Sequence, residues 1–330
     1  MNTQYESHID ALRTEFGSIV QTDVVLAPYT TFKIGGPADI FVEAKTIDQF
    51  VGIIRKSREL ELPIFILGGG TNILIGDKGI RGLVIKNSTR TIKIRGVVGS
   101  EKSGKTSKIA YVEADSGVLL NSLVRYTVEE GLDGLQMHLG LPGTVGGAVY
   151  MNSKWTKPLG YVGDCVHSAK ILSVDGTIRE EPKSFFQFAY DYSILHTTSD
   201  VLLSVTFEMP VNDTHALWEV ANNSIAHRRE TQPQGIKSAG CIFKNIPKEL
   251  AVSQKTPEET TSAGYLIDSV GLKGLSVGEA KISDQHANFI VNTGKASASD
   301  VLQLINRAKD QVKQRYNILL EEEIIRVGEF

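Results

Sequence analysis

The spacing of apolar residues along the chain alternates between a helical and a strand-like period. Four segments repeat apolar side chains every three or four residues and are predicted to be amphipathic helices: 46–60, 117–131, 213–229 and 297–316. Thr46 is followed by Gln49, and Ser297 by Asp300, at the spacing of a helix N-cap and its third residue. Gly131 follows the second apolar stripe and is expected to end that helix.

Shorter segments that are rich in β-branched and apolar residues predict strands. They are 41–44, 64–67, 82–87, 91–98, 108–116 and 200–209. The segment 167–181 has Asp175–Gly176 near its centre, which indicates a β-hairpin with a tight turn. Helices and strands are mixed along the whole chain, and this order predicts an α+β fold that begins with a strand-helix-strand-strand unit.

Length, charge and cysteine content exclude several classes of protein. A chain of 330 residues is expected to form two or three domains, at ~150 residues per domain. The net charge of −3 gives no bulk attraction to nucleic acid or to an anionic membrane, and no apolar run reaches membrane-spanning length. Cys165 and Cys241 form no CxxC pair, so we expect neither a disulfide framework nor a metal site. The start of the chain lacks a signal-peptide pattern, which favours a cytoplasmic location.

The segment Gly99–Thr106 matches the phosphate-binding pattern GxxxxGK[ST]. That mechanism needs a helix after the loop, because the helix N-terminus and the loop N–H groups hold the phosphates together. The residues after Thr106 alternate like a strand instead. We therefore interpret this segment as a solvated hairpin loop.

Two glycine-rich segments are better candidates for an anion site. Gly68–Gly70 follow the apolar strand 64–67, and a second loop extends over Gly140–Asn152, where Pro142 restricts the backbone. Glycines permit close approach of the backbone and leave N–H groups to face an anion. Neither segment matches GxGxxG followed by a helix, which disfavours a Rossmann site. Two such loops could enclose a diphosphate from two sides.

Six segments together resemble the UDP-N-acetylenolpyruvoylglucosamine reductase (MurB) family. They are TTFKIGGPADIFVEA, PIFILGGGTNILI, GLPGTVGGAVYMN, SAGCIFKN, LIDSVGLKG and ISDQHANFIVNTGKASASDV, in the family's order from about Ala27 to Gly328. The resemblance implies an FAD-binding fold of the vanillyl-alcohol-oxidase/PCMH type with two subdomains, and a separate α+β substrate-binding domain. It also implies that NADPH reduces an enolpyruvyl ether on a UDP-sugar, in cytoplasmic peptidoglycan synthesis, and we expect a monomer.

The resemblance divides the chain into four parts. FAD-binding subdomain 1 is expected at 1–88, with an N-terminal extension to about residue 22, and subdomain 2 at 89–210. The substrate-binding domain is expected at 211–310, and a tail, 311–330, returns to the active site. The residues implied to contact FAD are Lys33, Ile34, Gly35, Gly68, Gly69, Gly70, Thr71, Asn72, Pro142, Gly143, Thr144, Gly146 and Gly147.

The implied reaction needs a group that stabilises negative charge on the substrate and an acid that protonates it. The acid of the family is a serine in AGSxFKN, and the matching residue here is Cys241. A thiol with an unperturbed pKa of ~8.5 is mostly protonated at neutral pH and can donate; the alternative is that Cys241 is only a buried small residue. The family's catalytic glutamate aligns with Glu323, and Glu321 or Glu322 takes this place if the register slips.

Four further residues are implied to line the substrate or the flavin, although each could equally be a structural polar group: Tyr190, Lys244, Asn245 and His286.

The chain departs from the family pattern at several positions of the catalytic face. Asp191 replaces the arginine of FxYRxS and is a candidate catalytic residue of opposite charge, which would repel a substrate carboxylate. Tyr150 stands where many members have arginine, the segment Ser153–Gly163 replaces AGAYG, and Glu279 replaces a glycine. Four residues are candidates for the missing cation: Lys154, Lys157, Arg228 and Arg229.

Three functions remain open from the sequence. The first is an active reductase with Cys241 as the acid, the second a flavin-binding homologue with a binding or regulatory role, and the third an FAD oxidoreductase that acts on another acid substrate. The retained Cys241, Lys244 and Asn245 favour the first function, and Asp191 favours the other two.

Overall fold

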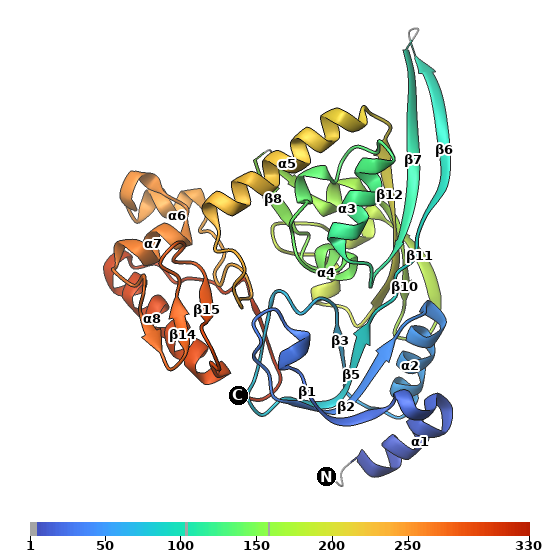
Figure 1. Ribbon diagram of the computed structural model, residues 1–330, viewed down its shortest axis with the longest axis horizontal. Helices are drawn as coiled ribbons and strands as arrows, with labels where there is room; N and C mark the ends of the chain where they lie inside the picture. Colours follow the sequence, from blue (N-terminus) through green and yellow to red (C-terminus); the bar gives the residue numbers. More distant parts are fainter. Residues whose placement is uncertain (1–4, 103–104, 158) are drawn as a thin grey trace.

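The computed structural model describes residues 5–102, 105–157 and 159–330, which form three units around a common centre (Figure 1). The first unit is a mixed four-stranded sheet of order β1-β2-β5-β3, in which β2, β5 and β3 are parallel and β1 is antiparallel. Its elements are α1 (Glu6–Phe16), β1 (Gln21–Val25), β2 (Pro37–Ala44), α2 (Ile47–Glu59), β3 (Ile64–Leu67), β4 (Ile73–Ile75) and β5 (Ile80–Asn87).

Helix α2 forms where the apolar spacing predicted it. The Thr46 hydroxyl accepts a hydrogen bond from the N–H of Gln49 (3.2 Å) and so begins the helix. The apolar stripe is fully buried in one core with strands β2 and β5, and includes Phe50, Ile53 and Ile54. Burial of this stripe holds the β3 end of the sheet in place, and the first glycine-rich loop follows directly after β3.

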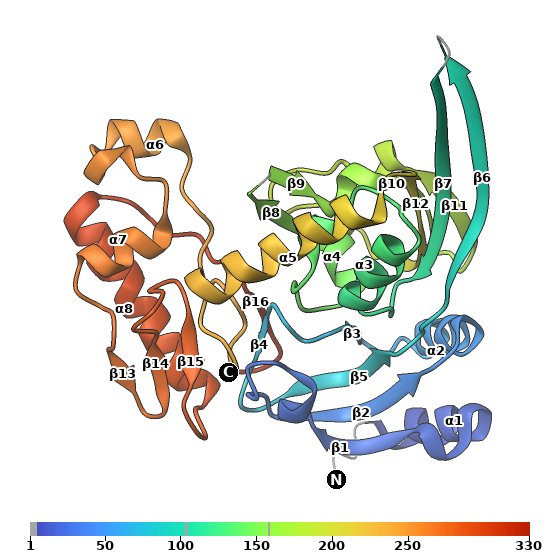
Figure 2. The same ribbon diagram turned by 45° about the horizontal axis from the view of Figure 1, so that its top comes forward.

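The second unit is an antiparallel five-stranded sheet of order β11-β10-β12-β7-β6. Three helices, α3, α4 and α5, lie on one side of it (Figures 1 and 2). Its elements are β6 (Ile92–Lys102), β7 (Lys105–Asp115), α3 (Leu120–Glu129), α4 (Val145–Tyr150), β8 (Lys154–Thr156), β9 (Leu159–Tyr161), β10 (Val166–Leu172), β11 (Ile178–Pro182), β12 (Val201–Pro210) and α5 (Thr214–Thr231).

The long hairpin of β6 and β7 confirms the interpretation of the GxxxxGK[ST] match. Strand β7 begins at Lys105 and pairs with β6 in register, with Thr106 opposite Glu101, so a strand follows this segment where a phosphate-binding loop needs a helix. Ser103 and Gly104 lie outside the described residues.

Helix α5 requires a correction to the expected domain division at residue 211. Its Leu217 and Ala221 are buried in the same core as α3 and the five-stranded sheet. The apolar stripe of α5 was recognised from the sequence, but the stripe does not say which core it enters. The third unit therefore begins after α5.

The third unit is a small antiparallel sheet, β13-β14-β15, packed with helices. Its elements are α6 (Lys248–Ser253), α7 (Ala263–Ser269), β13 (Ser276–Val277), β14 (Ala280–Ile282), β15 (Ile290–Asn292) and α8 (Ala298–Tyr316). Phe32, Ile34 and Leu74 of the first unit are buried in the same core. The first and third units therefore share a continuous apolar contact. Among the described residues, no helix combines the length and hydropathy that crossing a membrane requires.

The C-terminal tail returns from the third unit to the first (Figure 2). Helix α8 continues to Tyr316, so the tail begins at Asn317, and the boundary expected at 311 lies inside the helix. Glu322 pairs with Phe243, and β16 (Ile325–Val327) then pairs in parallel with β4. This path carries the glutamates 321–323 between the two units.

Candidate active site

The two glycine-rich loops lie against each other, and this contact explains their lack of side chains. A Cβ atom on Gly69 would lie 2.7 Å from the Cα of Gly143, and one on Gly68 would lie 2.6 Å from Thr144 Oγ1. Gly70 has a φ of +62° and also lies too close to the Tyr29 carbonyl for a side chain. Side chains at these positions would separate the loops.

The backbone N–H groups of this contact have no partner in the described part of the chain. No described residue accepts a hydrogen bond from the N–H groups of Gly68, Gly69, Gly70, Thr71, Asn72, Gly143 or Thr144. Unpaired N–H groups inside a protein are costly, so the arrangement suits an anionic ligand with several oxygen atoms, such as a diphosphate.

Two of the predicted glycines do not offer free N–H groups. Gly146 donates to the Ser116 carbonyl (2.7 Å), and Gly147 donates to Thr144 Oγ1 (3.3 Å). These bonds begin the short helix α4, for which Thr144 is the N-cap. The Gly147 carbonyl accepts from the N–H of Met151 (3.0 Å), so this glycine is left to contact a cofactor mainly through its Cα. Pro142 precedes the open part of the loop.

The loop that contains Lys33, Ile34 and Gly35 packs beside the first glycine-rich loop, because Thr31 donates from its N–H to the Gly70 carbonyl (3.0 Å). Ile34 is buried in the core of the third unit, so only its backbone can reach a ligand. The Lys33 ammonium donates to the Pro28 carbonyl (2.8 Å).

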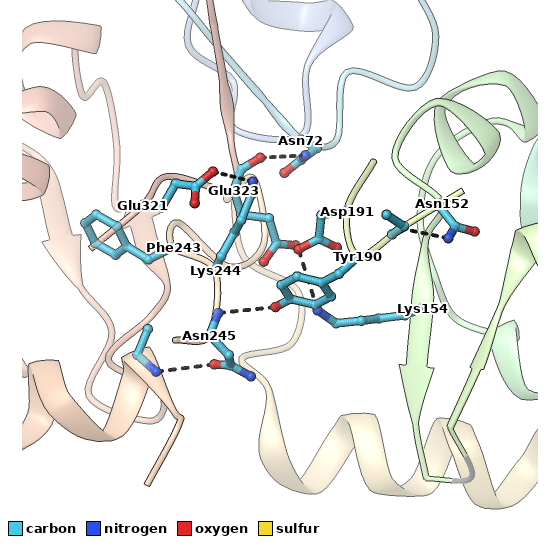
Figure 3. A network of polar contacts seen from close by, with 12 residues as sticks. Asn72, Asn152, Lys154, Tyr190, Asp191, Phe243, Lys244, Asn245, Glu321 and Glu323 are labelled. Carbon is cyan, nitrogen blue, oxygen red and sulfur yellow. Dashed lines mark hydrogen bonds and ion pairs between the residues drawn. The ribbon is translucent and has the colours of Figure 1, made fainter. Parts of the chain in front are cut away.

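The segment Cys241–Asn245 and the tail are held together by backbone pairing. Glu323 donates from its N–H to the Ile242 carbonyl (2.8 Å), and Lys244 donates from its N–H to the Glu321 carbonyl (2.9 Å). The Asn72 amide donates to the Glu323 carbonyl (3.1 Å), which links this pairing to the first glycine-rich loop (Figure 3). The structure therefore brings Cys241, Glu323 and Asn72 together from three distant parts of the sequence.

The three adjacent glutamates are distinguished by their partners. Glu321 is exposed and forms an ion pair with Lys244, and Glu322 forms ion pairs with Lys309 and Arg326. Glu323 has no such ion pair among the described residues. Glu323 is thus the glutamate whose charge is left to the Cys241 and Asp191 cluster, and its catalytic role stays a prediction.

Asp191 and Tyr190 approach the same place on a tight turn. Ala189 and Tyr192 pair across the turn, and Asp191 at its tip has a φ of +50°, which aspartate tolerates better than most residues. The Tyr190 hydroxyl accepts a hydrogen bond from the N–H of Asn245 (3.2 Å), so the turn of the second unit contacts the segment of the third.

Two asparagines that the sequence analysis did not select position these segments. The Asn152 side chain donates to the Ala189 carbonyl (2.9 Å) and accepts from the N–H of Gly163 (3.0 Å). The Asn288 side chain bonds both backbone groups of Phe243, at 2.8 and 2.9 Å. Both lie inside the family-like segments, but only their contacts reveal this role.

Burial and like charges raise the pKa values of the acidic groups in this cluster. The pKa of Glu323 is raised to about 7, first by burial and then by the negative charge of Asp191. Burial also raises the pKa of Asp191, and the Cys241 thiol has a raised pKa because of burial and the charge of Glu323. At neutral pH the thiol is therefore protonated, and Glu323 holds its proton part of the time.

The four candidates for the missing cation lie in different surroundings. Lys154 on β8 lies with Nζ 3.6 Å from Asp191 Oδ2 and 3.3 Å from the centre of the Tyr190 ring (Figure 3). The Arg228 guanidinium is buried and stacks on Trp155 at 4.0 Å. Lys157 and Arg229 are exposed.

His286 and Tyr150 are held by packing contacts. His286 packs edge-on against Phe289, and its Nδ1 accepts from the N–H of Asn288 (3.2 Å). Tyr150 stacks on His196, with ring centres 4.0 Å apart. These contacts give both side chains a structural role, and a substrate contact of His286 stays a prediction.

The raised pKa of Glu323 predicts a specific pH dependence of stability. The folded protein keeps this proton up to about pH 7, whereas the unfolded chain loses it near pH 4.5. The folded state therefore binds more protons inside this window, so the free energy of unfolding falls as the pH rises through it. We expect Glu323→Gln to remove this penalty. At pH 8 its free energy of unfolding should exceed that of wild type by up to about 3 kcal/mol, with a higher Tm, and at pH 5 the difference should be much smaller.

The matched control is Glu321→Gln, because the Glu321 side chain is 72% exposed and its ion pair contributes little. Thermal unfolding of the three proteins at both pH values is the measurement. An equal shift of Tm at pH 5 and pH 8 for Glu323→Gln would contradict the raised pKa.

Two family models match separate parts of the chain. One, described as FAD binding domain, matches residues 38–181. The other, described as UDP-N-acetylenolpyruvoylglucosamine reductase, C-terminal domain, matches residues 232–327. The second match begins directly after α5, where the buried cores also divide.

Solved structures support the fold at two levels of similarity. The UDP-N-acetylenolpyruvylglucosamine reductase of Thermus caldophilus aligns with a TM-score of 0.72 and 33% identity, over 92% of this chain and 97% of that chain. p-Cresol methylhydroxylase aligns over 95% of this chain and 88% of its own, with a TM-score of 0.51 and 10% identity, and shows the fold alone. The expected PCMH-type fold is confirmed.

Full-length relatives give the same family. The UDP-N-acetylenolpyruvoylglucosamine reductase of Desulfosudis oleivorans is 36% identical over 326 residues, covering 96% of this chain and 97% of the relative. The enzyme of the same name from Alkaliphilus oremlandii is 36% identical over 311 residues, covering 94% of each. The chain therefore belongs to the UDP-N-acetylenolpyruvoylglucosamine reductase family and is an FAD-dependent oxidoreductase.

Proposed function

We propose that this protein reduces UDP-N-acetylglucosamine enolpyruvate to UDP-N-acetylmuramate with NADPH, a step of peptidoglycan precursor synthesis. The observation that carries the proposal is the meeting of a protonated Cys241 thiol and Glu323 with the glycine-rich loops, through the bond from Asn72 to the Glu323 carbonyl. An acid for the substrate thus lies next to a place that suits a cofactor diphosphate.

The residues of the two loops fit FAD, because their unpaired N–H groups suit its diphosphate and the absent side chains leave room for it. FAD held there would supply hydride transfer from NADPH to the terminal vinyl carbon of the substrate. The residues proposed to hold FAD are the backbone of Lys33 to Gly35, Gly68, Gly69, Gly70, Thr71, Asn72, Pro142, Gly143, Thr144, Gly146 and Gly147.

Cys241 is the proposed proton donor. Hydride addition leaves negative charge beside the substrate carboxylate, and the thiol transfers its proton to the ether-bearing carbon. The raised pKa does not prevent this step, because that carbon is far more basic than a thiolate. The resulting thiolate lies in the field of Lys154 and Arg228, whose charges favour it, and it recovers a proton from water.

Glu323 and the Tyr190–Asn245 contact complete the proposed site. A carboxyl group with a pKa of about 7 can donate a hydrogen bond to the developing charge while it is protonated. Tyr190, Lys244 and Asn245 lie where the second and third units meet and are proposed to contact the UDP-sugar. Each of them is fixed by a backbone or side-chain bond before the substrate arrives.

A second candidate function is a flavin protein of this family that does not carry out this reduction, whether as a binding protein or as an oxidoreductase for another acid. The observation that favours it is Asp191, a buried carboxylate close enough to Glu323 to raise its pKa. A negative charge at this position opposes an anionic substrate.

An anaerobic experiment separates these functions. The FAD of the purified protein is reduced with NADPH, UDP-N-acetylglucosamine enolpyruvate is added, and the flavin absorbance is followed. We expect rapid reoxidation. A flavin that is reduced but is not reoxidised by this substrate would exclude the proposed reaction, and a flavin that NADPH does not reduce would favour the binding protein.

Removal of the Cys241 thiol is expected to slow the protonation step. Cys241→Ala should slow reoxidation by the substrate by about 100-fold or more, the typical contribution of a general acid, while FAD stays bound. Cys241→Ser keeps a proton donor and should retain most of the rate. Cys165→Ala is the control, because it removes the other thiol and should change the rate less than twofold. Equal rates for Cys241→Ala and wild type would remove Cys241 from this role.

A methyl group between the two glycine-rich loops is expected to weaken FAD binding. Gly69→Ala places a Cβ 2.7 Å from the Cα of Gly143, so the loops must separate, and we expect at least a tenfold increase in the Kd for FAD. Gly96→Ala is the control, because Gly96 has open space around it and no positive φ. Titration of the apoprotein with FAD measures both variants, and unchanged affinity of Gly69→Ala would contradict the proposed site.

A further inference from the structure

The proposed substrate carries a carboxylate next to the reacting carbon, and the site has few charges to receive it. Asp191 and Glu323 are acidic, and the Cys241 thiol is neutral because its pKa is raised by burial. A carboxylate that enters such a site needs a cation with unused N–H groups to replace the hydrogen bonds it loses from water.

Three of the nearby basic residues are poorly placed for this task. Lys244 forms an ion pair with Glu321, which directs its ammonium group toward the exposed tail. The Arg228 guanidinium is buried against the Trp155 ring. Its Nε and Nη2 are also unpaired among the described residues, but its charge acts on Cys241 less than that of Lys154 and is not among the charges that shift the pKa of Glu323. Lys157 is exposed on the turn that follows β8.

Lys154 has the required surroundings. Its side chain is only 17% exposed, and Nζ lies 3.3 Å from the centre of the Tyr190 ring, which is a cation–π contact. Asp191 Oδ2 lies 3.6 Å away, close enough for an ion pair but too far for a hydrogen bond. Among the described residues, none accepts a hydrogen bond from Lys154 Nζ, so its N–H groups remain available to a ligand.

A second observation comes from Asp191 itself. Its side chain is 5% exposed, and Oδ2, the atom that faces Lys154, has no hydrogen-bond partner among the described residues. Buried carboxylate oxygens are normally hydrogen-bonded, and one that is not depends on an opposite charge nearby to offset its burial. Among the described residues, the ion pair with Lys154 is therefore what offsets the charge of this oxygen.

The two partners also come from the two parts of the chain that depart from the family motifs. Asp191 replaces the arginine of FxYRxS, and Lys154 lies in the segment Ser153–Gly163 that replaces AGAYG. Asn152 holds the two parts together through the Ala189 carbonyl and the N–H of Gly163. The segment with Asp191 has thus lost a positive charge, and the segment with Lys154, which contacts it, supplies one.

We infer that Lys154 is the specificity-determining cation of this site and binds the carboxylate of the enolpyruvyl group, with Asp191 as its counter-ion in the ligand-free protein. The inference rests on the proposed function, because it concerns the same substrate. Binding of the carboxylate then depends on Lys154, whereas binding of the UDP-sugar does not.

Two ligands that differ only in the enolpyruvyl group test this statement. UDP-N-acetylglucosamine enolpyruvate and UDP-N-acetylglucosamine are titrated into the oxidised, FAD-loaded protein, and the flavin absorbance reports binding. We expect Lys154→Met to raise the Kd of the enolpyruvyl ether on the order of 10- to 100-fold, the usual effect of a lost hydrogen bond to a charged group. The Kd of UDP-N-acetylglucosamine should change less than twofold.

Two further variants keep the test interpretable. Lys157→Met removes an exposed lysine of the same hairpin and should leave both affinities unchanged. Lys154→Arg keeps the charge and should bind the ether with most of the wild-type affinity. Normal binding of UDP-N-acetylglucosamine by Lys154→Met would show that this variant is folded.

Two outcomes overturn the inference. One is wild-type affinity of Lys154→Met for the ether, and the other is an equal loss of affinity for both ligands. Neither outcome decides whether the wild-type protein turns over, which the anaerobic reoxidation measures separately. Wild-type protein that reoxidises with the ether while Lys154→Met binds it normally would retain the proposed function and reject Lys154 as its cation.

Discussion

The active-site cluster depends on the backbone pairing of the C-terminal tail with two units at once. Residues 321–323 bond the segment Cys241–Asn245 of the third unit, and β16 directly afterwards pairs with β4 of the first. Because Asn72 lies at the start of β4 and also bonds the Glu323 carbonyl, one short stretch of tail fixes the acid, the glutamate and the glycine-rich loop relative to one another. Other polar bonds also join the first and third units, such as those from Asn292 to the Phe32 carbonyl and from Ala298 to Asp77, but they lie outside this cluster.

The tail also determines the charge state of the site. It delivers Glu323 into the neighbourhood of Asp191 without an ion pair among the described residues, while Glu321 pairs with Lys244 and Glu322 with Lys309 and Arg326. The result is a cluster that holds protons at neutral pH on both the Cys241 thiol and, in part, Glu323. Such a cluster suits the protonation of a basic carbon. Recognition of an anion then needs a cation, which is the role that we propose for Lys154 on β8.

The comparison between sequence and structure follows from the range of each interaction. Helices α2 and α8 begin where Thr46 and Ser297 predicted them, because an N-cap acts on residues that are its neighbours in the chain. Helices α4 and α7 and the short strands of the third unit were not predicted, because six or seven residues are too few to show a period. The core in which α5 is buried was assigned wrongly, because an apolar stripe shows that a helix is buried on one side but not which elements it packs against.

The sequence alone determined the family, the α+β class, the two glycine-rich loops and the residue types at the site. Each of these follows from short motifs or from the spacing of apolar residues that are close in the chain. Only the tertiary structure decided which of the three glutamates and which loop N–H groups lack a partner among the described residues, and that Lys154 lies beside Asp191. These features arise from contacts between residues far apart in the chain, 37 positions in the last case, and no local pattern of side chains encodes a distance of this kind.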